Sequence, residues 1–179
     1  YLSTLILPYS NTSILSYLTT SLIIYFNYLC LRNNVKPTGM AEKPRLLYIT
    51  RKEHFNAAHK LFNPNWTEEE NDAVFGRCAN KNWHGHNFNL YVTVKGTPNP
   101  DTGFVIDLKV LKKIIRDKVI DKMDHRNINE DVEFMRGQMA SIENMAVAIW
   151  EQIEPELTNC QLHCIKLYET ESNYVEYYG

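Results

Sequence analysis

Residues 86–95 alternate between apolar and polar side chains, and this alternation constrains the fold of the chain more than any other feature. The two sets are Phe88, Leu90, Val92 and Val94 against Asn87, Asn89, Tyr91 and Thr93. Side chains two residues apart on a strand point to the same face of a sheet. The segment is therefore predicted to be a β-strand with one buried face, and His84 and His86 at its start share the parity of that face.

The pair His84-Gly85-His86, with His59 upstream, predicts a metal site. Three imidazoles suit zinc and leave the fourth tetrahedral position to water or substrate, as in catalytic zinc sites. Cys78 lies between the histidines in the sequence and offers an alternative. If its sulfur is a fourth ligand, the site is closed and the zinc is structural. Spacing alone leaves both arrangements open.

Composition narrows the class of protein. The chain has 179 residues, a formal net charge of −2 and Lys and Arg residues interspersed with acidic ones, so no nucleic acid partner is expected. Its four cysteines form no CxxC pair and no disulfide framework. These features predict one globular domain in a reducing compartment, with a cytoplasmic location.

The first 41 residues differ from the rest because they contain no Asp, Glu or His. We expect residues 1–39 to be a leader or an unstructured apolar extension, with Met40 as the natural start and residues 40–179 as a single domain. The alternative is an anchor at residues 14–31, although Ser, Thr and Asn dilute its apolar character. No membrane contact is expected for the domain itself.

Periodicity and turn residues predict an α+β domain with the order ββααββ. Four strands and two helices on one face are expected. The predicted elements are a strand with a break over 46–59, a short capped helix at 67–75, the strand 86–95, a short arm at 104–106, a helix after Asp107 with apolar residues at 108, 111, 115 and 119, a helix from Ser141 to Pro155, and a hairpin of 162–169 with 174–178.

Five motifs occur in order and with compatible gaps: Phe55-Asn-Ala-Ala-His59, Phe75-Gly-Arg-Cys-Ala-Asn-Lys-Asn-Trp-His-Gly-His-Asn87, Asp124-His-Arg-Asn-Ile128, Ser141-Ile-Glu-Asn144 and Tyr168-Glu-Thr170. With them, residues 46–179 resemble the 6-pyruvoyl-tetrahydropterin synthase family. The resemblance implies a tunnelling fold (T-fold), in which trimers close a barrel and two trimers stack into a homohexamer with active sites between subunits.

The resemblance also implies a reaction. Family members convert 7,8-dihydroneopterin triphosphate to 6-pyruvoyl-tetrahydropterin in tetrahydrobiopterin biosynthesis, with Zn²⁺ at the site and Mg²⁺ accompanying the triphosphate. The six-residue step from Cys78 to His84 is similar to the animal-type enzymes. The alternatives are a 6-carboxy-tetrahydropterin synthase, in which that step is usually shorter, and a non-catalytic zinc or pterin-binding protein with Cys78 as the fourth ligand.

By resemblance, His59, His84 and His86 hold the metal and Cys78 is the general base, for which a thiolate is required. Asp124 and His125 resemble a proton relay in which the carboxylate fixes the histidine tautomer. The alternative roles are a buried structural cysteine for Cys78 and a helix-terminal pair for Asp124 and His125.

Two carboxylates match the substrate-binding positions of the family. Glu169 matches the group that binds the guanidine-like edge of the pterin by two parallel hydrogen bonds. Glu143 matches a second carboxylate near the pterin, but it also fits ordinary helix N-terminal chemistry. Two positions depart from the family: Trp83 stands where Gly is common, and Ile142 stands where a hydroxyl residue is common.

Overall fold

The computed structural model describes residues 22, 24–25, 28–29 and 45–179. The chain divides into two units, Tyr1–Lys43 and Pro44–Gly179. The five described residues of the first unit are helical. The predictions of a leader at 1–39 and of an anchor at 14–31 lie mostly outside the described residues. Within the described part, no helix is both long and apolar enough to cross a membrane.

The second unit contains a sheet and the helices that pack on it. Its strands are β1 (Leu47–His59), β2 (His84–Gly96), β3 (Arg126–Asn127), β4 (Gln161–Tyr168) and β5 (Tyr174–Tyr177). Its helices are α2 (Glu68–Phe75), α3 (Leu108–Ile115), α4 (Asp121–Met123) and α5 (Ile142–Ile153), with a π-helical turn Arg116–Ile120 joining α3 to α4 and 3-10 turns at Gly76–Ala79, Glu133–Met135 and Glu154–Glu156.

The strand order is β3-β1-β2-β4-β5. β1 and β2 form a long antiparallel pair in which Leu47 lies opposite Gly96 and His59 opposite His84. The pairs β2–β4 and β4–β5 are also antiparallel, whereas the short β3 runs parallel to β1. The two histidines of the HGH motif therefore lie at the end of the longest ladder, beside the last residue of β1.

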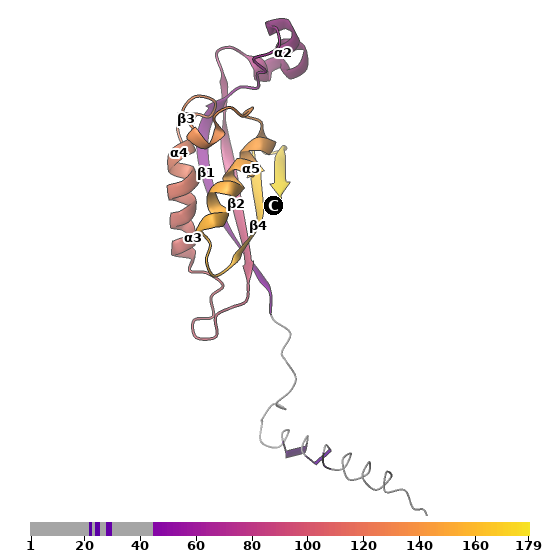
Figure 1. Cartoon of the computed structure of the whole chain (residues 1–179), viewed down its shortest axis with the longest axis vertical. Helices are drawn as coiled ribbons and strands as arrows, with labels where there is room; N and C mark the ends of the chain where they lie inside the picture. The colour runs from indigo at the N-terminus through magenta and orange to yellow at the C-terminus, as the bar shows by residue number, and fades with distance from the viewer. Residues whose placement is uncertain (1–21, 23, 26–27, 30–44) are drawn as a thin grey trace, which may run out of the picture. The chain divides into compact units, whose positions relative to one another are not determined.

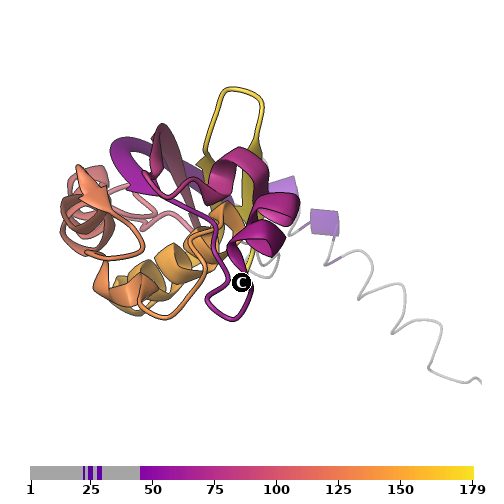
Figure 2. The same cartoon turned by 90° about the horizontal axis from the view of Figure 1, so that it is seen from above.

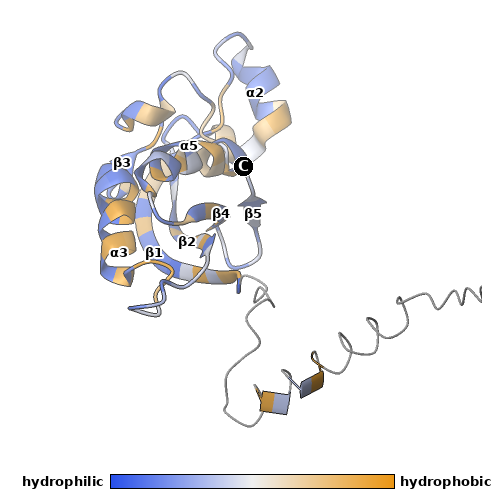
Figure 3. Cartoon of the chain, turned by 60° about the horizontal axis from the view of Figure 1, so that its bottom comes forward, coloured by the Kyte–Doolittle hydropathy of each residue, from blue (hydrophilic) through white to orange (hydrophobic). Residues whose placement is uncertain are grey.

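The helices α3, α4 and α5 cover one face of the sheet (Figures 1 and 2), while α2 lies beyond the end of β1 and β2. Between these layers is the core, to which Phe55, Phe88 and Leu90 contribute from the sheet. The helices contribute Leu111, Ile115, Val119, Met145, Ile149 and Ile153, all fully buried. Hydropathy changes around α3 as expected for a helix with one buried side (Figure 3).

Local sequence signals set the helix ends as predicted. Thr67 and Glu70 form the capping box that begins α2. The Asp107 carboxylate accepts the Lys109 N–H, and the Ser141 hydroxyl accepts the Asn144 N–H. Pro155 lies in the 3-10 turn Glu154–Glu156 that follows α5.

The structure confirms an α+β fold and differs from the prediction in three details. β1 is continuous, residues 104–106 form no strand, and β3 adds a fifth strand that makes the sheet mixed. β3 has only two residues, which is too short for any periodicity to reveal. It forms because Asn56 O accepts the His125 N–H at 2.6 Å and Ala58 O accepts the Ile128 N–H at 2.8 Å.

Candidate metal centre and its surroundings

The three predicted metal ligands meet at the end of the β1–β2 ladder. His59 lies opposite His84, and His86 lies opposite Ala57, so all three imidazoles project from the core face of the sheet. Their ring centroids are 4.5 to 5.3 Å apart. One nitrogen from each ring lies within 4.8 Å of the others. Phe88 closes the base of the cluster, 5.8 Å from the ring of His59.

Gly85 permits this approach of the two strands. A Cβ atom at this position would lie 3.0 Å from the carbonyl oxygen of Ala57 and 3.6 Å from the Ala58 Cα, both of which belong to the backbone of the paired strand. A side chain here would push β2 away from β1 and separate His84 from His59. The glycine of the HGH motif therefore serves the geometry of the ladder.

The nitrogens of the cluster fit a metal ion. His59 Nε2 and both ring nitrogens of His84 are buried and have no hydrogen-bond partner among the described residues. Buried polar atoms are normally satisfied. His59 Nδ1 lies 2.8 Å from the carbonyl oxygen of Ala140 and can only donate to it, which leaves the lone pair of Nε2 facing the cluster. A divalent cation of the zinc type would satisfy these atoms.

Electrostatics favour the neutral, ligating form of two of the imidazoles. Burial is the main factor that lowers the pKa of His59, with a smaller contribution from the neighbouring His84; the Ala140 hydrogen bond acts in the opposite direction. Burial also lowers the pKa of His84, aided by His86. Only a neutral imidazole has the free lone pair that a metal requires.

The segment 60–83, which connects β1 to β2, brings Cys78 to the edge of this site. It lies in the 3-10 turn Gly76–Ala79, and its carbonyl oxygen accepts the N–H of Leu61 at 2.9 Å. This hydrogen bond holds the turn that contains Cys78 next to the end of β1. Among the described residues, Cys78 is not part of the group of mutually close ligand atoms. It lines a cavity of about 420 Å³ next to His59.

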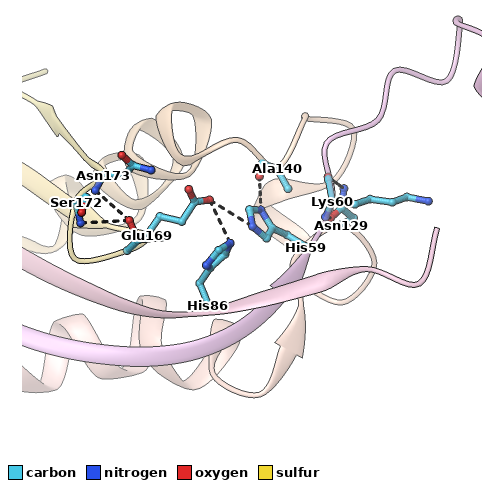
Figure 4. A network of polar contacts seen from close by, with 9 residues as sticks. His59, Lys60, His86, Asn129, Ala140, Glu169, Ser172 and Asn173 are labelled. Carbon is cyan, nitrogen blue, oxygen red and sulfur yellow. Dashed lines mark hydrogen bonds and ion pairs between the residues drawn. The ribbon is translucent and has the colours of Figure 1, made fainter. Parts of the chain in front are cut away.

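Both predicted pterin-binding carboxylates line that same cavity, and we name it the Cys78 cavity. Glu143 enters it from the first turn of α5, where it is exposed. Glu169 enters from the residue after β4 and is half-buried, with its Oε1 3.4 Å from His59 Nε2 and 3.8 Å from His86 Nε2 (Figure 4). The Glu169 carboxylate thus lies beside two of the imidazoles as well as in the Cys78 cavity.

Asp124 and His125 lie apart from the Cys78 cavity. They follow α4, and together with Arg126 and His86, His125 lines a second cavity of about 510 Å³. Asp124 Oδ1 accepts the Asn56 N–H at 2.8 Å and lies 3.0 Å from His125 Nδ1. The Asn56 N–H is the largest factor that lowers the pKa of Asp124, with a smaller one from His125. Within residues 45–179 of one chain, no hydrogen bond or ion pair joins either residue to Cys78, which lines the Cys78 cavity instead.

The backbone at Trp83 shows what one departure from the family pattern entails. Trp83 has a φ of 67°, in the left-handed region that glycine adopts without strain. The Lys60 ammonium lies 4.5 Å from the Trp83 ring and 4.9 Å from the Phe62 ring. Asn129 holds the backbone of Lys60 at both its N–H and its carbonyl. The residues flanking His59 and His84 are thus joined by a cation–π contact.

Sequence reasoning did not identify Ala140 or Asn129. Ala140 acts through its backbone oxygen, and no residue type marks such a role. Asn129 directly follows the third motif, Asp124–Ile128, but its contact with Lys60 joins positions 69 residues apart. Only the folded chain reveals that these two residues orient the end of β1.

The comparisons with known proteins agree with this geometry. Residues 48–179 match the family model described as 6-pyruvoyl tetrahydropterin synthase. The chain is 38% identical over 135 residues to the 6-pyruvoyl tetrahydrobiopterin synthase of Dictyostelium discoideum, covering 75% of this chain and 98% of that protein. The human protein of the same name is 38% identical over 131 residues, covering 73% of this chain and 90% of the human protein.

A solved structure shows the same fold. The Caenorhabditis elegans 6-pyruvoyl tetrahydropterin synthase superposes with a TM-score of 0.72 at 34% identity, covering 77% of this chain and 99% of that one. The similarity to a 6-carboxy-5,6,7,8-tetrahydropterin synthase is more distant: the Bacillus subtilis protein is 26% identical over 144 residues, covering 76% of this chain and 88% of that protein. The chain belongs to the 6-pyruvoyl tetrahydropterin synthase family.

Proposed function

We propose that the chain is a zinc-dependent 6-pyruvoyl-tetrahydropterin synthase of the animal type. Its substrate is 7,8-dihydroneopterin triphosphate and its product belongs to tetrahydrobiopterin biosynthesis. The observation that carries the proposal is the set of unsatisfied imidazole nitrogens beside a cavity that also contains a thiol and two carboxylates. The identity of 36–39% to 6-pyruvoyl tetrahydrobiopterin synthases, against 26% to the Bacillus subtilis 6-carboxy enzyme, supports this choice of product.

The substrate and product fix the balance of the reaction. One side-chain alcohol is oxidised to a ketone, and its two electrons and protons reduce the ring C=N bond. A proton lost from the neighbouring carbon accompanies departure of triphosphate, and the resulting enol becomes the second ketone and a methyl group. No external oxidant or reductant is needed. The protein must therefore remove and return protons at the side-chain carbons.

The chain supplies groups for each part of this task. His59, His84 and His86 would hold a zinc ion, whose Lewis acidity would polarise the side-chain hydroxyls and make the adjacent C–H bonds more acidic. Cys78, as thiolate, removes a proton at the edge of the Cys78 cavity. Glu169 and Glu143 bind the pterin ring in that cavity. Mg²⁺ accompanies the triphosphate as a charge-neutralising partner.

Asp124 and His125 act as a proton relay in this proposal. His125 exchanges protons at its ring, and Asp124 orients it through Nδ1, since these atoms lie 3.0 Å apart. His125 is 76% exposed and lines a different cavity from Cys78. Within one subunit the relay and the base are thus separated, which favours a site completed by a second copy of the chain.

A homohexamer built as a dimer of trimers provides such a site. Both sheet edges support it: the outer edge of β1 pairs with β3 only at Ala57 and Ala58, and β5 is a four-residue edge strand. Exposed apolar residues also gather at the start of β1, where Leu46, Leu47 and Tyr48 are each 45 to 52% exposed. A cytoplasmic enzyme is consistent with the free cysteines at 78, 160 and 164.

Product identification tests the reaction. Purified zinc-loaded protein is incubated with 7,8-dihydroneopterin triphosphate and Mg²⁺, and the products are separated by chromatography with mass detection. We expect triphosphate and a tetrahydropterin that retains its three-carbon side chain. A carboxy-tetrahydropterin plus acetaldehyde would assign the chain to the other branch, and unchanged substrate on a zinc-loaded protein would leave it a binding protein.

Complementation tests the shared site. Cys78→Ala and His125→Ala proteins are purified separately, then dissociated, mixed and reassembled. If base and relay come from different subunits, mixed hexamers regain part of the activity that each variant lacks. Recovery restricted to the mixed sample, with a hexamer mass in sedimentation, supports the proposal; a fully active wild-type monomer contradicts it.

A further inference from the structure

The Glu169 side chain extends toward the metal-facing atoms of the imidazole cluster (Figure 4). Its Oε1 lies 3.4 Å from His59 Nε2 and 3.8 Å from His86 Nε2. The carboxylate makes no hydrogen bond to any other described residue, although the Glu169 backbone N–H is bound by Asn173 O at 3.1 Å. The backbone at Glu169 is thus held in place, whereas no hydrogen bond to a described residue fixes its carboxylate.

The hydrogen bond between His59 Nδ1 and the Ala140 carbonyl determines how the contact between Glu169 and His59 Nε2 is interpreted. His59 Nδ1 is already engaged with the Ala140 carbonyl, so Nε2 is the nitrogen left to face a metal. A carboxylate beside Nε2 therefore cannot be an outer partner that orients the ring, because outer partners bind the nitrogen that does not ligate. With a metal bound at Nε2, the same oxygen would face the metal itself.

The distances agree with a shared metal. Zinc binds nitrogen and carboxylate oxygen at about 2.0 to 2.2 Å, so two ligand atoms of a tetrahedral site lie roughly 3.3 Å apart. The separations of 3.4 and 3.8 Å are close to this value without any movement of the strands. Cys78, in contrast, lies outside the group of mutually close ligand atoms in the described part of the chain.

We propose that Glu169 is the fourth protein ligand of the metal when no substrate is bound, and that it leaves the metal when a pterin ring binds. The second step rests on the proposed function, in which this carboxylate binds the paired N–H donors of the ring. One carboxylate cannot serve both partners with the same oxygens. Ring binding then vacates a coordination position at the time when the substrate hydroxyls need it, so that substrate itself opens the metal site.

The first experiment uses the metal alone. Zinc is titrated into the metal-free full-length protein in competition with a chelator, for the wild type and for Glu169→Gln, with Glu143→Gln as the matched control in the same cavity. We expect the Kd for zinc to rise at least about tenfold in Glu169→Gln and to stay within about twofold in the control. Equal Kd values for the wild type and Glu169→Gln would overturn the ligand assignment.

The second experiment reads the coordination directly. Cobalt(II) replaces zinc, and the visible spectrum is recorded with and without pterin, a ring that lacks the three-carbon side chain. We expect the wild-type spectrum to shift on adding pterin toward that of Glu169→Gln, and the variant spectrum to stay unchanged. Identical spectra of the two proteins without pterin would overturn the assignment. A difference between them that pterin leaves unaltered would overturn the exchange.

Two further controls separate the possible failures. Circular dichroism and thermal unfolding of the metal-loaded proteins establish that Glu169→Gln is folded; if it is not, Glu169→Asp replaces it, because the shorter side chain keeps the charge but withdraws the carboxylate from the imidazoles. The metal titrations require no turnover. If the ligand results hold while the wild type forms no product from dihydroneopterin triphosphate, the proposed function fails and the assignment of Glu169 to the metal stands.

Discussion

The histidine cluster and the Asp124–His125 pair are held in opposite ways. His59 is almost fully buried and His84 and His86 are partly buried, all three on paired strands whose register fixes them. His125 is 76% exposed and takes a φ of 58°, two residues after the end of α4. The three histidines come together within one chain, whereas the Asp124–His125 pair lies at the surface. A metal ion is held best by donors in fixed positions, whereas an exposed pair of side chains can contact a neighbouring subunit.

The largest expected effect tests whether the cluster is the functional metal site. We predict that His86→Ala lowers metal affinity at least about 100-fold and turnover on the order of 1,000-fold, because it removes a direct ligand. Metal content after dialysis and initial rates measure both. The control is His54→Ala, a histidine on β1 whose side chain is exposed. Equal losses in the two variants would show that the cluster has no special role.

The next effect separates Cys78 from the cluster. Cys78→Ala should retain one zinc per chain and lose at least about 100-fold in turnover, as expected for a missing general base. Cys160→Ala, a half-buried cysteine outside the motifs, serves as the control. Joint loss of zinc and of folded structure in Cys78→Ala would instead make the sulfur a structural ligand.

A smaller effect concerns the strained link between His84 and Lys60. Trp83→Gly and Trp83→Ala both remove the cation–π contact, but only glycine relieves the left-handed backbone. We expect Trp83→Gly to be more stable than Trp83→Ala by about 1 kcal/mol in urea unfolding of the metal-free protein. If the two variants unfold at the same urea concentration, the strain at this position is absent in solution.

The smallest effect tests how Asp124 is anchored to β1. Its folded-state pKa is lowered, so its charge contributes stability above the unfolded pKa of about 3.9 and the contribution is lost as the pH falls through the folded value. We predict that Asp124→Asn costs about 1 kcal/mol or less at pH 7, given its partial exposure, and nothing once the pH is well below the folded-state pKa. Unfolding curves across pH measure this, with the exposed Asp101→Asn as control. A cost that persists at low pH would contradict the electrostatic explanation.

Much of the fold follows from local patterns. The alternation of 86–95, the caps at Thr67, Asp107 and Ser141, and the apolar stripes of α3 and α5 gave the elements and their order. These signals depend only on near neighbours in the chain. The structure departs from them at β3 and at residues 104–106, where segments of two or three residues carry too few side chains to establish a period.

The sequence by itself determined that His84 and His86 share one face, because a two-residue spacing on a strand places them there whatever surrounds them. Only the tertiary structure decided which nitrogen of His59 faces the cluster, that the Glu169 carboxylate meets His59 and His86, and that His125 and Cys78 line separate cavities. The physical reason is the distance along the sequence between the groups that interact. Strand geometry is set by adjacent peptide units, whereas these contacts join residues on elements far apart in the chain, whose positions depend on how the whole core packs.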